Sequence, residues 1–83
     1  MKLKVRYFAS IREALGPGET LDVLDGATVW HVRDTLIDRG GAHAIALARG
    51  RALRCALNHV LCKESASIEA GAELAFFPPV TGG

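Results

Sequence analysis

The residues with the clearest chemical potential stand at the end of the chain, in the stretch Phe-Phe-Pro-Pro-Val-Thr-Gly-Gly at positions 76–83. Because proline fixes φ and has no amide hydrogen, Pro78 and Pro79 should end the preceding strand and stiffen the path that leaves it. Gly82 and Gly83 carry no side chain, so this end could enter a channel too narrow for a Cβ atom. The reactive group at its tip would be the α-carboxylate of Gly83.

A Gly-Gly pair at a chain end is, taken alone, more often a frayed terminus than a functional one. Here it follows a double proline and a phenylalanine pair, and this combination favours the functional interpretation. We therefore predict a folded domain at residues 1–77 and a flexible tail at residues 78–83. The residues expected to enter a partner's channel ahead of Gly83 are Pro78, Pro79, Val80, Thr81 and Gly82.

Composition excludes several classes of function. The chain has 83 residues, 49% hydrophobic and 23% charged, which suits one small domain with a single core. Ten Lys plus Arg against nine Asp plus Glu give a net charge of +1, which makes no electrostatic case for nucleic acid or an anionic membrane. No apolar run approaches the roughly 20 residues of a membrane span, and the start lacks a signal peptide's apolar segment. Two cysteines do not make a disulfide framework, so we expect a cytoplasmic protein.

The apolar pattern predicts strands and helices in a mixed order. Alternation predicts strands at residues 2–8 and 19–24, a hairpin at 53–62 with its turn at Asn58-His59, and a last strand at 73–77. Helical spacing of Val29, Val32 and Leu36 predicts the main helix, which should begin after an N-cap at Thr28. Shorter helices are predicted at residues 10–15 and 42–49. One main helix and about five strands are most simply arranged as a mixed sheet wrapped around the helix, an α+β fold.

This order of elements resembles the β-grasp, or ubiquitin-like, fold. Three stretches resemble more closely the small, sulfur-carrier subunits of molybdopterin synthase: Phe-Ala-Ser-Ile-Arg-Glu at positions 8–13, Asn58 at the hairpin turn, and residues 76–83. The resemblance covers essentially the whole chain. It departs at residues 70–73, where Ala-Gly-Ala-Glu replaces the Asp-Gly-Asp-Glu that is frequent in the family, a change that could alter docking of the activating enzyme.

The resemblance implies a mechanism. A ubiquitin-activating-like adenylyltransferase would use ATP to adenylate the carboxylate of Gly83, and a sulfur donor would convert the adenylate to a thiocarboxylate. The loaded tail would enter the large subunit of molybdopterin synthase and give its sulfur to cyclic pyranopterin monophosphate, which forms the molybdopterin dithiolene. Two small and two large subunits would assemble into a heterotetramer. The chain would then bind no cofactor or metal itself and would not be catalytic alone.

A docking surface is predicted from pattern and fold together. In a β-grasp sheet the first and last strands are parallel neighbours, so Phe8 and Phe77 should lie together on the face away from the helix. The alternation of side chains places Ala75 and Leu61 on the same face. An exposed apolar cluster of this kind, beside the tail, indicates a binding site for another protein. We predict that Phe8, Leu61, Ala75 and Phe77 contact the large subunit and, at another time, the activating enzyme. The competing prediction is that Phe8 or Phe77 tucks around an edge into the core.

Cys55, His59 and Cys62 form a C-x3-H-x2-C spacing that superficially resembles half of a metal site. Three ligands fall short of the four that structural zinc requires, and a histidine in the turn would point away from cysteines facing the core. Buried, apolar cysteines are the simpler interpretation. Alternation in the hairpin places a set of apolar residues on one face, which we expect to be the core: Leu53, Cys55, Leu57, Val60 and Cys62. A disulfide between them is geometrically conceivable, but they form a hydrogen-bonded pair with Cα atoms about 5.5 Å apart, and the reducing cytosol argues against it.

Two other functions stay open at this point. One is a sulfur carrier for thiamine thiazole or another thio-cofactor, which would share the Gly-Gly end; such carriers tend to be shorter and do not present Phe-Phe-Pro-Pro. The other is a β-grasp binding module whose tail is inert, because one fold serves many unrelated functions.

Overall fold

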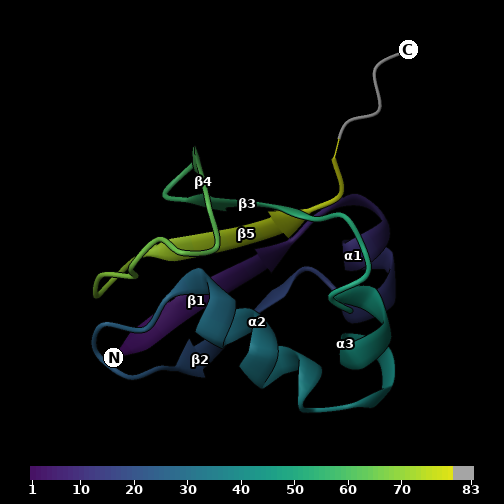
Figure 1. The fold of residues 1–83 in the computed structure, drawn as a ribbon, viewed down its shortest axis with the longest axis horizontal. Coiled ribbons are helices and arrows are strands. Elements are labelled where there is room, and N and C mark those ends of the chain that lie inside the picture. Colours follow the sequence, from purple (N-terminus) through teal and green to yellow (C-terminus); the bar gives the residue numbers. More distant parts are fainter. Residues whose placement is uncertain (80–83) are drawn as a thin grey trace.

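A five-stranded mixed sheet with helices on one face makes up the fold (Figure 1). The computed structural model describes residues 1–79. Its elements, in chain order, are β1 (Lys2–Tyr7), α1 (Ala9–Leu15), β2 (Gly18–Asp22), α2 (Val29–Ile37), α3 (Gly41–Ala46), β3 (Arg54–Leu57), β4 (Val60–Cys62) and β5 (Glu73–Phe77). Within this part of the chain, no helix has the length and apolar character needed to cross a membrane.

The strand order is β2-β1-β5-β3-β4, with β1 and β5 parallel and the other neighbours antiparallel. The predicted α+β, β-grasp architecture is therefore confirmed, including the parallel pairing of the first and last strands. The neighbouring inner strands β1 and β5 supply much of the core, because every second side chain on them points to the helices. Leu3, Val5 and Tyr7 on β1 and Leu74 on β5 are 0% exposed.

Helix α2 lies across this buried face of the sheet (Figure 1). Val29, Val32 and Leu36 form its predicted buried stripe and are at most 1% exposed. Burial of side chains of this size contributes roughly 2 kcal/mol each. Thr28 is the N-cap, as predicted: its Oγ1 accepts from the His31 N–H at 3.3 Å, and His31 Nδ1 accepts from the Thr28 N–H at 3.3 Å.

A buried arginine on α2 holds the chain that leads from α3 into β3. Arg33 is 3% exposed, and its guanidinium donates to the carbonyl oxygens of Leu47 at 2.8 Å and Ala48 at 2.6 Å. It also donates to Glu64 Oε2 at 2.8 Å. Because a buried guanidinium is stable only when its charge and its donors are matched, these contacts fix two loops against α2.

A second polar cluster joins β1 and β2 to α3 and to the turn that precedes it. The Tyr7 hydroxyl donates to Glu19 Oε2 at 2.7 Å, His43 Nε2 lies 3.0 Å from the same oxygen, and Arg39 pairs with Glu19 Oε1. Partial burial raises the pKa of Glu19, but the hydrogen bonds from His43, Tyr7 and Arg39 outweigh burial and lower it to about 2. Burial, and next the Glu19 contact, raise the pKa of Tyr7, so its hydroxyl remains a donor.

Replacing Glu19 with Gln should reduce stability in a pH-dependent way. The lowered pKa means that the carboxylate stabilises the fold above about pH 4.5, and this contribution is lost as the pH falls towards 2. At pH 7 the variant should lose about 2 kcal/mol, the size expected for hydrogen bonds to a charged group. Urea unfolding between pH 7 and pH 2 should show a shallower acid loss in E19Q than in wild type; parallel curves would contradict this assignment.

The β3–β4 hairpin has the predicted register, with Cys55 opposite Cys62 and Leu57 opposite Val60. Its turn residues Asn58 and His59 have φ of 49° and 70°, the left-handed values that a two-residue turn between twisted strands favours. The expectation that Val60 faces the core was wrong, because this side chain is 68% exposed. β4 is an edge strand of three residues, and its first two residues, Val60 and Leu61, are exposed.

Candidate functional site

The point at which the tail leaves the domain is set by the parallel pairing of β1 and β5. Tyr7 lies opposite Phe76, and the Phe8 N–H donates to the Phe76 carbonyl oxygen at 3.1 Å, so both strands end together. The chain then leaves the sheet through Pro78 and Pro79, both half-buried, beside α1 (Figure 1). The remaining predicted site residues, Val80, Thr81, Gly82 and Gly83, lie outside the described residues. Their roles, and the division of the chain at residue 77, stay predictions.

We define the docking face as Phe8, Leu61, Ala75 and Phe77, and the structure places all four on the side of the sheet away from α2. Phe8 is 40% exposed and Leu61 67%, whereas Ala75 and Phe77 are half-buried. The alternate residue Phe76 points to the helices and is 1% exposed. Neither Phe8 nor Phe77 tucks into the core, so the competing prediction was wrong. That this face binds a partner stays a prediction.

Strand register explains how these residues meet. Phe8 continues from Tyr7, so it stands beside Phe77 just as Tyr7 stands beside Phe76. Ala56 lies opposite Ala75 on one side and opposite Leu61 on the other. The small side chain of Ala56 is 7% exposed and keeps the face flat between β5 and β4. Sequence reasoning missed Ala56, although its position in the hairpin register, opposite Leu61, was the available signal.

Basic side chains border the docking face. The Arg6 guanidinium carbon lies 5.6 Å from the centroid of the Phe8 ring, within the range of a cation–π contact. Arg6 also pairs with Glu73 at 3.6 Å, a half-exposed contact that contributes little to stability. Arg54 is exposed and lies opposite Phe77 in the β3–β5 register. An apolar centre with a basic border fits a partner surface that is apolar with acidic groups at its rim.

Asn58 fixes the hairpin to the start of β5. Its side-chain Oδ1 accepts from the Glu73 N–H at 3.0 Å, and its own N–H donates to the Glu73 carbonyl oxygen at 2.9 Å. These two bonds hold the turn, and with it Leu61, in position relative to Ala75. The residue that supported the family resemblance therefore has a structural role in shaping the docking face.

A groove opens beside the base of the tail, between α1, α3 and the segment that precedes β3. Its volume is about 450 Å³, and its walls include Ile11, Ala14, Ala46, Leu53 and Pro78. The sequence carried no signal for it, because the groove depends on how two short helices pack. It adds apolar surface next to Pro78 but no reactive group.

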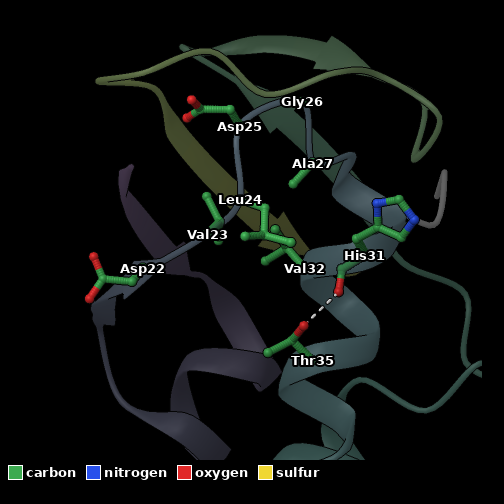
Figure 2. Close-up of a pocket in the computed structure, with 9 residues that line it drawn as sticks. All are labelled: Asp22, Val23, Leu24, Asp25, Gly26, Ala27, His31, Val32 and Thr35. Atoms are coloured by element: carbon green, nitrogen blue, oxygen red, sulfur yellow. Dashed lines mark hydrogen bonds between the residues drawn. The ribbon is translucent and has the colours of Figure 1, made fainter.

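A pocket of about 370 Å³ lies between the β2–α2 loop and α2 (Figure 2). Figure 2 shows Leu24 and Val32 at its centre, with the carboxylates of Asp22 and Asp25 pointing away from them. Two of the polar side chains here already have structural partners: the Thr35 hydroxyl donates to the His31 carbonyl oxygen at 2.9 Å, and Asp22 pairs with Lys2 at 2.9 Å. We therefore find no arrangement suited to catalysis among the residues that line this pocket.

The residues of the C-x3-H-x2-C spacing do not converge in the structure. The sulfur atoms of Cys55 and Cys62 are 3.7 Å apart on the strands. His59 stands in the turn, where its Nε2 lies 3.4 Å from Glu73 and its side chain is 87% exposed. Within residues 1–79, no set of three His, Cys, Asp or Glu side chains could hold a metal ion.

Comparisons with known proteins agree with this geometry. The chain is 41% identical over 81 residues to the molybdopterin synthase sulfur carrier subunit of Haemophilus influenzae, with 98% of this chain and 99% of that protein covered. It is 38% identical over 81 residues to the protein of the same name from Escherichia coli, with the same coverage. The crystal structure of SAMP1 from Haloferax volcanii superposes with a TM-score of 0.78 at 29% identity over the full length of both chains. The model of the ThiS family matches residues 5–83, and the chain therefore belongs to the ThiS family.

Proposed function

We propose that this chain is the sulfur carrier subunit of a molybdopterin synthase. Two relatives that bear this name align with 98% of the chain at 41% and 38% identity. The structural observation that carries the proposal is the parallel β1–β5 pairing. It sets Phe8 and Phe77 together on an open apolar face at the point where the tail leaves the domain.

The proposed chemistry takes place at the carboxylate of Gly83. A carboxylate is a poor electrophile, so the activating enzyme joins it to AMP from ATP and releases pyrophosphate. The sulfur donor then displaces AMP, which leaves a thiocarboxylate. In the large subunit this sulfur is the nucleophile that attacks cyclic pyranopterin monophosphate, with the chain terminus in the place of a catalytic side chain. The domain supplies the reactive atom and the docking face, while acid–base groups come from the partner.

The proposed partners are the large subunit, in an assembly of two small and two large chains, the activating adenylyltransferase, and a sulfur donor. ATP is consumed by the activating enzyme and is not held by this chain. The large subunit and the activating enzyme would each cover the docking face while the tail reaches their active sites. Binding of the two would therefore be mutually exclusive, which makes loading and delivery successive steps.

We place this function in the cytosol. The chain has two cysteines, too few for a disulfide framework, which fits a compartment whose glutathione and thioredoxin keep cysteines reduced.

Reconstitution tests this function against its alternatives. The chain, its activating enzyme, ATP and a sulfur source are incubated, and the large subunit and cyclic pyranopterin monophosphate are then added. Molybdopterin should form, and its formation should require the large subunit. A loaded chain that gives no dithiolene with an active large subunit would contradict the proposal and favour a carrier for thiamine thiazole or another thio-cofactor. Failure to load with a demonstrably active enzyme would favour an inert binding module.

A further inference from the structure

Two thiols meet at the edge of the core, in the hairpin that carries part of the docking face. Cys55 on β3 lies directly opposite Cys62 on β4, and their sulfur atoms are 3.7 Å apart. Cys55 Sγ also lies 3.3 Å from the Cys62 carbonyl oxygen. Cys55 is 5% exposed, whereas Cys62 is half-buried and is the more exposed residue of the two. The proposed sulfur-carrier function uses neither thiol.

The backbone already has the separation that a disulfide needs. Cys55 and Cys62 form a hydrogen-bonded pair of the antiparallel ladder, in which Cα atoms are about 5.5 Å apart. Disulfides span Cα separations of roughly 4.4–6.8 Å. The sulfur atoms can therefore approach bonding distance by side-chain rotation, without movement of the strands. The objection raised from the sequence, that this kind of pair is unsuited to a disulfide, does not hold for this hairpin.

We propose that Cys55 and Cys62 form a reversible oxidation site, at which a peroxide or a low-molecular-weight disulfide closes an intramolecular disulfide in the folded protein. The bond would remain open in a reducing cytosol and close under oxidising conditions, as is typical of redox-responsive cysteines in that compartment.

With hydrogen peroxide the reaction balances in two steps. The Cys62 thiolate attacks one peroxide oxygen, which gives a sulfenic acid and the first water. The Cys55 sulfur then attacks the Cys62 sulfur and expels hydroxide, which takes up the Cys55 proton as the second water. The thiols lose two electrons and two protons, and the peroxide is reduced to two waters. Burial is the largest cause that raises the pKa of Cys55, and it persists after Cys62 is oxidised, so the second step is slow at neutral pH and faster in mild alkali.

The cross-link would act on the outermost strand of the sheet. β4 has three residues and a single neighbouring strand, and it presents Val60 and Leu61 to solvent at 68% and 67% exposure. A bond to Cys55 ties this strand to β3, which is held between β4 and β5. Oxidation should therefore raise the melting temperature of the domain and fix Leu61 within the docking face.

The test is peroxide treatment of the full-length native chain, followed by intact-mass measurement and peptide mapping under non-reducing conditions. The expected product is a monomer that has lost two hydrogen atoms, contains a Cys55–Cys62 link, melts at a higher temperature and returns to the starting mass with dithiothreitol. Its rate of formation should rise between pH 7 and pH 9. The matched variant Cys55→Ser should instead stop at a Cys62 sulfenic acid that dimedone traps.

Three results would overturn the proposal. One is sulfinic or sulfonic acid at Cys62 while Cys55 stays reduced. Another is a covalent dimer of two chains in place of the internal bond. The third is an internal bond that forms only in denaturant or that lowers the melting temperature. Because these measurements use the unaltered chain, a folding defect in the serine variant does not affect them, and they are independent of whether Gly83 carries sulfur.

Discussion

Removal of Gly83 should abolish molybdopterin formation and leave the domain folded. In the proposed mechanism the Gly83 carboxylate is the group that receives AMP and then sulfur, so a chain ending at Gly82 presents its carboxylate one residue short of both active sites. A near-attack geometry requires the reacting atoms to lie within roughly 3.5 Å, and the loss of one residue exceeds that tolerance. Reconstituted synthesis should fall below detection, while circular dichroism and the melting temperature match those of wild type.

A C-terminal extension provides the complementary experiment, because it keeps Gly83 but replaces its carboxylate with an amide. Activity should again be lost. The matched control places the same extension before Met1, at the end of the sheet opposite the C-terminal end of β5 (Figure 1), and should retain full activity. If the C-terminally extended protein still produced molybdopterin, the assignment of the chemistry to this carboxylate would be wrong.

Substituting Phe77 with Glu should weaken binding to both the large subunit and the activating enzyme by on the order of 100-fold, the effect of placing a charge in the apolar centre of an interface. The fold should survive because Phe77 is half-buried on the open face, whereas the neighbouring core residue Phe76 is 1% exposed. Calorimetric titration with each partner, together with thermal unfolding of the free variant, measures both effects.

The control for this substitution is Leu24→Glu. Leu24 is 83% exposed and lies in the β2–α2 loop, where it lines the pocket against α2 (Figure 2), whereas the docking face is on the side of the sheet away from α2. Both affinities should therefore stay within a few-fold of wild type. A Phe77→Glu variant that binds both partners normally but melts much earlier would show that Phe77 acts in the core. A loss of one partner only would show that the two partners do not share this face.

Much of the fold could be predicted because the alternation of apolar and polar residues along a strand indicates directly which side chains are buried. Leu3, Val5 and Tyr7 on β1, and Leu74 and Phe76 on β5, alternate with exposed or half-buried residues, and all five are fully or almost fully buried. The hairpin register also followed from the sequence, because a two-residue turn at Asn58-His59 determines which residues face each other. The positions of Phe8 and Phe77 then depended on the parallel pairing that the fold resemblance implied.

Features that depend on side-chain packing could not be predicted. Nothing local distinguishes buried Arg33 from an exposed arginine, because its partners Leu47 and Glu64 are 14 and 31 residues away in the sequence. The exposure of Val60 depends on how far the helices extend over an edge strand. The contact between the cysteine thiols could not be predicted either, because it depends on the side-chain rotamers as well as on the strand register. In the candidate site, the basic border formed by Arg6 and Arg54 depends on the pairing of β1 and β3 with β5, which brings residues from distant parts of the sequence together.

Sulfur on Gly83 can be detected from the intact mass of the chain after incubation with ATP, its activating enzyme and a sulfur source. A variant with both cysteines replaced by Ala serves as the control, since it cannot carry sulfur as a persulfide. In wild type and control alike, one carboxylate oxygen should be replaced by sulfur, and fragmentation should place this sulfur on Gly83. An unchanged mass with an enzyme of demonstrated activity, or sulfur found on Cys55 or Cys62 instead, would contradict the proposed function.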